Sequence, residues 1–437
     1  MDRKYLICEN VSVSDTGRLL FAGQDTCDLA QKYGTPLYLM DEDRIRNRCR
    51  IYLSAVKQAF GEKAKVLFAS KAASFKRIYE IMNEEGMGID VVSCGEINTV
   101  LKAEYPLRNA YFHSNNKTDA DIAFAMNHGI GYFVVDNEEE LLAIQAQAKE
   151  RSIQQKILLR ITPGIDPHTY AAVSTGKVDS KFGNAIETGM AEAITRLALA
   201  QGNIDLCGFH CHVGSQVFDS NVYLRAADVM LSFIADIKQK TGFTAKELDL
   251  GGGYGVRYVS TDPFIDIEEN IIAVGKWIYE KCNTLGIERP IVLFEPGRSI
   301  VADAGMTLYT VGSVKKIPGY KNYVSVDGGM TDNVRFAMYG SAYTVLPADR
   351  TDRPFDMECS VVGRCCESGD IIQNNVMLPA DMKRGDLLAV LTTGAYNYSM
   401  ASNYNRIPRP PIVMLAQGKS YVAVRRESFD DIVRLDV

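Results

Sequence analysis

From residue 66 to residue 304 the chain repeats one pattern of hydrophobic and polar positions. A short β-branched or aromatic run is followed by a polar turn and then by apolar residues at helical spacing. The strand-like runs are Val66–Ser70, Ile89–Val92, Ala110–His113, Tyr132–Val135, Ile157–Ile161, Leu206–His212, Glu247–Leu250 and Ile291–Phe294. The clearest helical segments are Asp219–Lys240 and Ile267–Leu285. Eight such repeats predict an α/β fold, a parallel (β/α)8 TIM-like barrel, rather than an open sheet.

Beyond residue 304 the pattern changes to strand-like runs without long helical segments between them. These runs are Thr307–Ser313, Tyr323–Val326, Glu358–Val362, Leu387–Leu391 and Ser420–Arg425. They predict a mostly β domain of barrel or sandwich type. Tyr5–Ser14 also alternates like a strand, and because chain termini often lie close together we expect it to pack with this C-terminal domain. The expected domains are therefore residues 1–34, a barrel over 35–304 and a β domain over 305–437.

Composition narrows the class of protein. The chain has 437 residues, 46% of them hydrophobic, which is ample for a large core. A formal net charge of −6 without a lysine- or arginine-rich cluster argues against a nucleic-acid partner. We find no signal peptide and no membrane-spanning stretch, so we expect a cytoplasmic protein that does not bind membranes. The ten scattered cysteines are expected to be free thiols.

Reactive groups stand at the C-terminal ends of several predicted barrel strands. Lys71 follows the first strand and His212 ends the sixth. Gly251–Gly253 follows the seventh strand, and Glu295-Pro296-Gly297-Arg298 follows the eighth. Barrel enzymes carry their catalytic groups on this face, and core packing does not explain why such groups should converge there. We therefore predict an active site at this end of the barrel.

Together these groups meet the needs of pyridoxal phosphate. A lysine after a strand is usually a solvated surface residue, but the small apolar neighbours of Lys71 suit a desolvated amine that forms a Schiff base. Glycine triplets most often make tight turns, yet at this position Gly251–Gly253 also offers backbone N–H groups to a phosphate, with the Ser215 hydroxyl as a further partner. An anionic Glu295 would keep the pyridine nitrogen protonated and make the ring a strong electron sink.

The segment Cys207–His212 contains four possible metal ligands, Cys207, His210, Cys211 and His212. Side chains alternate between the two faces of a strand, so the two histidines should point one way and the two cysteines the other. We therefore expect no metal site. His212 is expected to project into the barrel mouth, and His210 to be a packed barrel residue.

Six motifs resemble those of the fold-type III pyridoxal-phosphate-dependent decarboxylases, a family that acts on ornithine, lysine, arginine or diaminopimelate. They are Ala69-Ser70-Lys71-Ala72, His212–Ser215, Gly251–Gly253, Glu295–Arg298, Cys366–Asp370 and Met400–Asn405. The last two are similar to motifs of the diaminopimelate-specific branch. This resemblance covers nearly the whole chain. It implies a barrel plus a β domain, and decarboxylation of meso-2,6-diaminopimelate to L-lysine, the last step of lysine biosynthesis.

The resemblance also implies a role for each matching residue. Lys71 would carry the cofactor, His212 would stack on its ring and Glu295 would meet its nitrogen. The phosphate region would be held by Ser215, Gly252, Gly253, Gly297, Arg298 and Tyr396. The distal end of the substrate would be held by Arg298, Arg335, Tyr339, Glu367 and Tyr396. In this family the catalytic cysteine, here Cys366, reaches across a homodimer, so each active site would be shared between two subunits.

Other functions stay open at this point. The chain could be a decarboxylase of another basic amino acid or polyamine precursor, such as ornithine, lysine, arginine or carboxynorspermidine. An alanine-racemase-like isomerase fits less well because the catalytic tyrosine setting is not evident, and a silent regulatory relative fits less well because Lys71 and Cys366 are both present. The sequence departs from the commonest family pattern at Ala73, Phe75, Arg364-Cys365 and Phe336.

Overall fold

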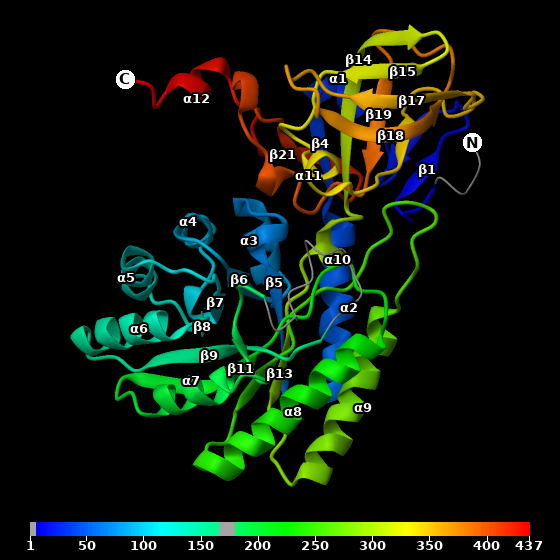
Figure 1. The fold of residues 1–437 in the computed structure, drawn as a ribbon. Coiled ribbons are helices and arrows are strands. Elements are labelled where there is room, and N and C mark those ends of the chain that lie inside the picture. The colour runs from blue at the N-terminus through cyan, green and yellow to red at the C-terminus, as the bar shows by residue number, and fades with distance from the viewer. Residues whose placement is uncertain (1–5, 166–179) are drawn as a thin grey trace. The chain divides into compact units, whose positions relative to one another are not determined.

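The computed structural model describes residues 6–165 and 180–437, which divide into two compact units (Figure 1). The β unit comprises residues 1–47, 256–263 and 300–437, and the barrel unit comprises residues 48–255 and 264–299. These ranges differ from the expected domains chiefly at the start of the chain. The segment 35–47, which we assigned to the barrel, belongs to the β unit.

The barrel unit contains a closed ring of eight parallel strands, which confirms the predicted fold. The strands are β5 (Ala64–Ala69), β6 (Gly88–Val91), β7 (Ala110–Phe112), β8 (Tyr132–Val135), β9 (Gln155–Thr162), β11 (Ile204–His210), β12 (Glu247–Asp249) and β13 (Ile291–Phe294). They pair in the order β9-β11-β12-β13-β5-β6-β7-β8, and the β8–β9 pairing closes the ring. The short strand β10 (Asn184–Ala185) adds to β9. Each of the eight predicted runs overlaps one barrel strand.

Helices surround this ring (Figure 1). They are α2 (Glu42–Phe60, which begins in the β unit), α3 (Lys76–Glu84), α4 (Cys94–Lys102), α5 (Asp119–Asn127), α6 (Glu138–Glu150), α7 (Met190–Leu199), α8 (Asn221–Thr241) and α9 (Ile267–Leu285). Several begin at side-chain caps, such as Thr118, whose side chain accepts the N–H of Asp121 in a capping box. Among the described residues, no helix is both long enough and apolar enough to span a bilayer.

The interior of the barrel is built in layers, because every second side chain of each strand points inward. The middle layer is apolar and consists of Leu67, Tyr111, Val134, Leu158, Cys207 and Leu293. Toward the N-terminal ends of the strands, buried Glu247 accepts from Lys65 at 2.7 Å and from Tyr132 at 3.2 Å. Toward the C-terminal ends lies a set of buried or half-buried ionisable residues, here called the polar layer: Asp90, His113, Asp136, Arg160, His210, Asp249 and Glu295. The apolar layer therefore separates two groups of charges.

One strand departs from simple alternation. The pairing of β11 with β9 shifts between Leu206 and Gly208, which marks a β-bulge. A side chain at Gly208 would meet the backbone oxygen of Glu247 at 1.8 Å, so only glycine fits there. The bulge places both Cys207 and His210 inside the barrel, three positions apart. Our prediction that these two side chains point to opposite faces was therefore wrong.

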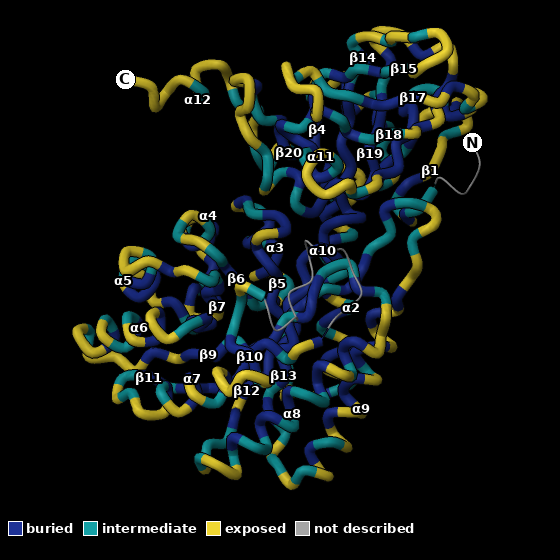
Figure 2. Tube along the Cα trace, viewed as in Figure 1, coloured by how far each residue is buried: buried dark blue, intermediate teal, exposed yellow. Residues whose placement is uncertain are grey.

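The β unit contains a nine-stranded sheet whose main path runs β18-β17-β15-β14-β4-β20-β21, with β19 pairing to β14 and β16 to β19. The strands are β4 (Leu37–Asp41), β14 (Gly305–Ile317), β15 (Lys321–Val326), β16 (Val345–Pro347), β17 (Met357–Val362), β18 (Ile371–Leu378), β19 (Leu387–Leu391), β20 (Ile412–Ala416) and β21 (Lys419–Val424). All five predicted C-terminal strands are present, and β4, β16, β18 and β20 were missed. Figure 2 shows β4, β19 and β20 as largely buried, whereas no residue of β21 is buried. The unit also holds α1 (Thr26–Tyr33), α11 (Arg335–Tyr339) and α12 (Phe429–Val433), while α10 (Arg298–Val301) begins in the barrel unit.

The N-terminal segment packs with the C-terminal strands, as predicted, but in a different way. Tyr5 lies outside the described residues, and the strand in this region is only Val11–Val13 (β1), in a small sheet with β2 (Leu19–Phe21) and β3 (Gln24–Asp25). The strand that joins the large sheet is β4, between β14 and β20. All five residues of β4 are buried, so it carries no polar alternation to reveal it as a strand.

Candidate active site

Lys71 lies directly after β5, on a short 3-10 turn over Ser70–Ala72. The turn is anchored to the next strand, since the backbone N–H of Ser70 donates to Asp90 Oδ1 at 3.1 Å. Ala72 and Ala73 are buried, but Lys71 itself is exposed. The apolar neighbours therefore do not desolvate the amine, contrary to the expectation from sequence. They hold the backbone and leave the side chain accessible.

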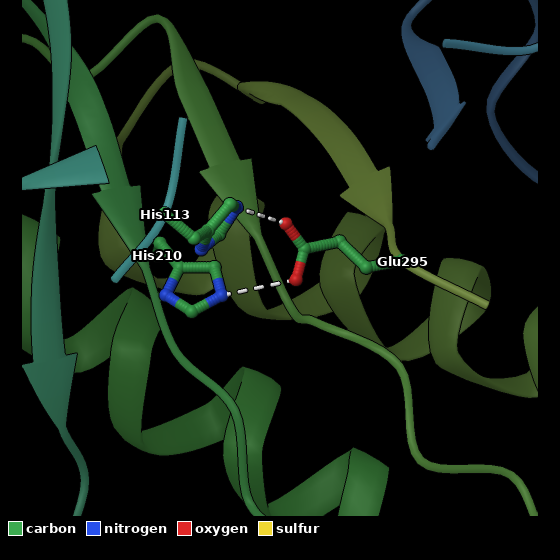
Figure 3. A group of neighbouring side chains, drawn as sticks. All are labelled: His113, His210 and Glu295. Atoms are coloured by element: carbon green, nitrogen blue, oxygen red, sulfur yellow. Dashed lines mark hydrogen bonds and ion pairs between the residues drawn. The ribbon is translucent and has the colours of Figure 1, made fainter. Parts of the chain in front are cut away.

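Glu295 lies at the end of β13 and its carboxylate is held by two imidazoles (Figure 3). His113 Nε2 is 2.7 Å from Oε1, and His210 Nε2 is 3.2 Å from Oε2. The His113 contact is close but not aligned as a hydrogen bond, so Oε1 still has room for a well-placed donor. All three residues are buried, and the two rings meet edge to face at 4.9 Å. A buried acceptor of this kind suits the protonated nitrogen of a pyridine ring.

Charges in the polar layer influence one another strongly. Burial alone would raise the pKa of Glu295, but His113 and His210 together lower it well below its usual range. Burial, and then the charge of Glu295, raise the pKa of Asp249 well above that of an ordinary carboxyl. The same two causes raise the pKa of Asp90 to about 6. Burial lowers the pKa of His210 to about 4. These shifts favour the charged form of Glu295 and the neutral form of Asp249, and a pKa of about 4 keeps His210 neutral at neutral pH.

His113, His210 and Glu295 are also, within the described residues, the group whose donor atoms could hold a metal ion, since these atoms lie within 4.8 Å of one another. Figure 3 shows each imidazole directed at a carboxylate oxygen. The direct contacts of Glu295 with His113 at 2.7 Å and with His210 at 3.2 Å are enough to explain why the three side chains lie together. We therefore assign the group to orientation of the carboxylate.

Backbone N–H groups and two polar side chains gather beside Glu295. Gly253 has a φ of +113°, and a side chain there would lie 2.2 Å from the backbone oxygen of Gly214. The neighbouring segments are joined by the N–H of Val217, which donates to the Gly253 oxygen at 3.0 Å. Ser215 Oγ accepts from the guanidinium of Arg298 at 3.0 and 3.2 Å. This close approach of bare backbone, a hydroxyl and a guanidinium fits the binding of a phosphate group.

His212 stands two residues beyond the end of β11 and is half-buried. Its ring lies close to Gly251, where an added side chain would meet His212 Nδ1 at 2.7 Å. Burial, assisted by the positive charge of Lys71, lowers the pKa of His212 well below its usual value. A neutral imidazole in this place can lie against an aromatic ring. Gly252 and Gly297 are equally restricted, because side chains there would collide with the Glu295 backbone oxygen at 2.0 Å and with the Ala69 side chain at 2.8 Å.

A second set of predicted residues gathers in the β unit, around Arg335 at the start of α11. Arg335 is 6% exposed, and its guanidinium carbon lies 5.2 Å from the ring centre of Tyr339 and 5.1 Å from that of Tyr396. Its Nε has no hydrogen-bond partner, and no carboxylate among the described residues pairs with it. Tyr396 has a φ of +68°, which is rare for a tyrosine and marks local strain. A buried, unpaired guanidinium between two aromatic rings is suited to a carboxylate ligand.

Cys366 lies on a loop between β17 and β18 and is the exposed one of the ten cysteines. Its backbone N–H donates to Asn405 Oδ1 at 2.7 Å, which joins the two motifs Cys366–Asp370 and Met400–Asn405. Buried Asp370 secures the base of the loop, because its carboxylate accepts the N–H groups of Met330 at 2.6 Å and Cys365 at 2.7 Å. Glu367 is exposed beside the thiol. The loop is thus held firmly while its thiol and carboxylate remain accessible.

Comparison with protein families now adds to this geometry. Residues 42–302 match the model of the pyridoxal-binding domain of pyridoxal-dependent decarboxylases, which is more than half of the chain. The chain belongs to this decarboxylase family. The match includes the barrel residues from Lys71 to Arg298 that were predicted from strand ends.

Curated members of the decarboxylase family resemble the chain over almost its full length. Diaminopimelate decarboxylase from Bacillus subtilis is 43% identical over 424 residues, which cover 96% of this chain and 95% of that protein. The enzyme of the same name from Staphylococcus aureus is 39% identical over 423 residues, covering 97% and 98%.

Solved structures of the decarboxylase family share the fold. Diaminopimelate decarboxylase from M. jannaschii superimposes with a TM-score of 0.90 at 31% identity, covering 99% of this chain and 98% of that one. A lysine/ornithine decarboxylase from Vibrio vulnificus gives a TM-score of 0.74 at 26% identity, covering 89% and 96%.

The structure thus places two groups of predicted residues, one in each unit. In the barrel unit, Ser215 and Arg298 are in direct contact, and Gly252 and Gly297 pack on Glu295 and on the end of β5. Sequence reasoning missed the contact partners of Glu295. It took His210 for a packing residue and did not single out His113 or Asp249, although His113 ends a predicted strand and Asp249 stands one residue before the end of another.

Proposed function

We propose that this chain decarboxylates meso-2,6-diaminopimelate to L-lysine and carbon dioxide with pyridoxal phosphate. One observation carries the substrate assignment: buried Arg335 has no carboxylate partner within the described residues. Diaminopimelate has a second carboxylate, which the substrates ornithine and lysine lack, and a guanidinium pairs with a carboxylate in a fixed fork geometry. The relatives whose names include diaminopimelate support the same substrate.

The residues of the barrel unit would bind and orient the cofactor. When bound, pyridoxal phosphate supplies an electron-accepting ring that stabilises the carbanion left by loss of carbon dioxide. Lys71 attaches it covalently, and Glu295 keeps its ring nitrogen protonated. His212 lies against the ring face. The phosphate is held by Ser215, Gly252, Gly253, Gly297, Arg298 and Tyr396.

The residues of the β unit would recognise the far end of the substrate. Arg335, together with Arg298, pairs with the distal carboxylate, and Tyr339 and Tyr396 line the same end. Glu367 accepts from the distal ammonium. These contacts would provide selectivity, because a basic amino acid without a second carboxylate would leave Arg335 buried and unpaired.

The test of this function measures carbon dioxide released by the purified chain from meso-diaminopimelate, LL-diaminopimelate, lysine, ornithine and arginine, with pyridoxal phosphate present. We expect release from meso-diaminopimelate, with a specificity constant at least about a hundredfold above those for the three basic amino acids. Preferred turnover of lysine or ornithine would replace this proposal by the activity named for the Vibrio vulnificus structure. No release from any substrate, with bound cofactor demonstrated, would refute the decarboxylase assignment.

Attachment of the cofactor tests the barrel site independently of turnover. We expect borohydride reduction of the loaded protein to fix pyridoxal phosphate on Lys71, because Lys71 is exposed at the barrel end that carries Glu295. Peptide mapping by mass spectrometry locates the modified lysine. Lys117 serves as an internal control, since its ammonium is completely buried and pairs with Glu140. Modification of a lysine other than Lys71 would contradict the assignment.

We propose further that the chain acts in the cytoplasm as a homodimer in which Cys366 of one chain serves the site that holds Lys71 of the other. The thiol would donate a proton to the substrate carbon after carbon dioxide leaves. Exposure of Cys366 on the single chain supports a role at an interface, since the other nine cysteines are buried or half-buried. Ten free thiols suit a reducing compartment.

Subunit mixing tests the shared site. Lys71→Ala and Cys366→Ala chains are each expected to be inactive, and random pairing of equal amounts should restore roughly a quarter of wild-type sites, because half of the dimers are mixed and each contains one intact site. Exchange is verified with tagged chains. Activity that stays at the level of the separate variants, with exchange proven, would refute a shared site.

A further inference from the structure

Three buried side chains from three different strands converge on Glu295. His113 comes from the end of β7, His210 from β11 and Asp249 from β12. We propose that His113 and His210 are positioning residues that hold Glu295 as an oriented anion toward the cofactor nitrogen, with Asp249 retained as a neutral acid beside it. The inference rests on the proposed function and concerns what makes Glu295 a competent partner for the ring.

The geometry restricts both rotation and approach of the carboxylate. Each oxygen of Glu295 contacts a different imidazole, Oε1 with His113 at 2.7 Å and Oε2 with His210 at 3.2 Å (Figure 3). Turning the carboxylate about its terminal bond would break both contacts. The two rings support each other edge to face at 4.9 Å, and none of the three side chains is more than 8% exposed. The orientation is therefore set by packing in the barrel interior.

Asp249 is the group beside Glu295 that would carry a proton. Its Oδ1 accepts the backbone N–H of Gly251 at 2.8 Å, while its buried Oδ2 finds no donor in the part of the chain that the structure describes. The carboxyl group of Asp249 interacts with that of Glu295. Two adjacent buried carboxyl groups are not both ionised, because their negative charges repel each other. A proton on Asp249 that is donated to Glu295 satisfies this orphaned atom. Of the two carboxyl groups, Glu295 then carries the negative charge.

Other charged groups face the same space and contribute to its balance. Around the ring these are Lys71 after β5, Asp90 on β6, Asp136 after β8, Arg160 on β9, and Cys211 and His212 after β11. Arg160 lies 3.9 Å from Asp136, which is its strongest charged partner, and it also interacts with Glu295 and Asp90. Lys71 lowers the pKa of Asp90, although burial and Glu295 raise it overall. Among residues 6–165 and 180–437, the side chains that interact directly with Glu295 are those of His113, His210 and Asp249.

The experiment observes protonation of the cofactor nitrogen directly. Holoenzyme is loaded with pyridoxal phosphate labelled with 15N in the ring, and the 15N chemical shift is followed from pH 6 to pH 9, together with the dissociation constant of the cofactor. In wild type we expect a protonated nitrogen across this range. In His113→Leu and His210→Leu we expect the nitrogen to lose its proton within the range and the cofactor to bind about tenfold more weakly.

Conservative variants separate positioning from a structural role. His113→Gln and His210→Gln retain a donor at the position of Nε2, so we expect them to restore the protonated 15N signal. Asp249→Asn mimics the neutral acid and should leave the signal unchanged and cofactor affinity within about threefold. His128→Leu, an exposed histidine after α5, is the matched control. Circular dichroism verifies folding, and the glutamine and asparagine variants keep the test decisive if a leucine variant does not fold.

The outcomes are distinguishable. A wild-type chain that does not bind the cofactor overturns both the proposed function and this inference. A wild-type chain with protonated nitrogen, together with leucine variants whose nitrogen stays protonated to pH 9, overturns this inference alone. Loss of the signal in Asp249→Asn would show that Asp249 acts as an anion, and would also overturn the inference.

Discussion

Arg335 offers the sharpest test of substrate recognition. It is 6% exposed, its Nε has no hydrogen-bond partner among the described residues, and it stands between the rings of Tyr339 and Tyr396. We expect Arg335→Gln to remove one charge-assisted pair with the distal carboxylate while keeping much of the side-chain length. Losing one partner of a buried, hydrogen-bonded charge pair costs on the order of 2 to 5 kcal/mol. The specificity constant for meso-diaminopimelate should therefore fall at least about thirtyfold.

The stability of the ligand-free chain should change little in Arg335→Gln. In the free chain the buried guanidinium has no carboxylate partner among the described residues, so its removal does not break an ion pair. Cation–π contacts with the two tyrosines contribute about 1 to 2 kcal/mol, and relief of the buried charge offsets part of that loss. We therefore expect the melting temperature of the ligand-free variant to change by only about 4 °C or less.

The assay compares initial rates over a range of substrate concentrations with the dissociation constant of the cofactor. Arg384→Gln is the matched control, since Arg384 is an exposed arginine of the same unit whose Nη1 donates to the Gly312 oxygen at 3.2 Å. Cofactor affinity should be unchanged in both variants. Equal kinetics for Arg335→Gln and wild type would place Arg335 outside the substrate pocket. A matching loss of cofactor affinity would show that it binds the cofactor instead.

Two further predictions concern stability. The ammonium of Lys117 is completely buried and donates to Glu140 at 2.8 Å and to the Val134 oxygen at 2.8 Å. In urea unfolding, Lys117→Met should therefore destabilise the barrel by about 3 to 5 kcal/mol, and Lys117→Met/Glu140→Leu should recover much of that loss. A Lys117→Met variant as stable as wild type would refute this prediction. Burial raises the pKa of Asp332 to about 7. The folded state therefore retains a proton that the unfolded chain loses above about pH 4. The free energy of unfolding falls as pH rises from about 4 to about 7. Asp332→Asn should therefore gain relative to wild type between pH 5 and pH 8, by at most about 4 kcal/mol in paired thermal melts, and a pH-independent difference would contradict the assignment.

The barrel was predictable because its strands and helices have different hydrophobic periods. β8 and α9 have the bounds expected from sequence, since both are flanked by polar turn residues. β4 was not recognised because it is uniformly buried and lies far in sequence from its partners β14 and β20. The bulge before Gly208 was also invisible, because it depends on contact with the backbone of Glu247 on the neighbouring strand.

The site was predictable where chemistry follows a strand end, as at Lys71 and Glu295. What surrounds those residues depends on the radius and register of the barrel. The alanines beside Lys71 suggested an enclosed amine, yet in the single chain the turn leaves the lysine exposed while burying its neighbours. The contact of His113 with Glu295 joins β7 to β13 across the barrel interior, and local sequence does not indicate such a pairing.

The placement of β4 has a consequence for how the protein can be made and divided. β4 lies between β14 and β20, so a ribosome must synthesise almost the whole chain before the central sheet can close. The barrel segment 48–255 emerges earlier and has its ring of strands almost complete, lacking only β13. A gene fragment that encodes only residues 305–437 would lack a central strand and present open edges on β14 and β20, which are hazards for aggregation. Tethering residues 1–47 to that fragment through a short linker would supply the missing strand.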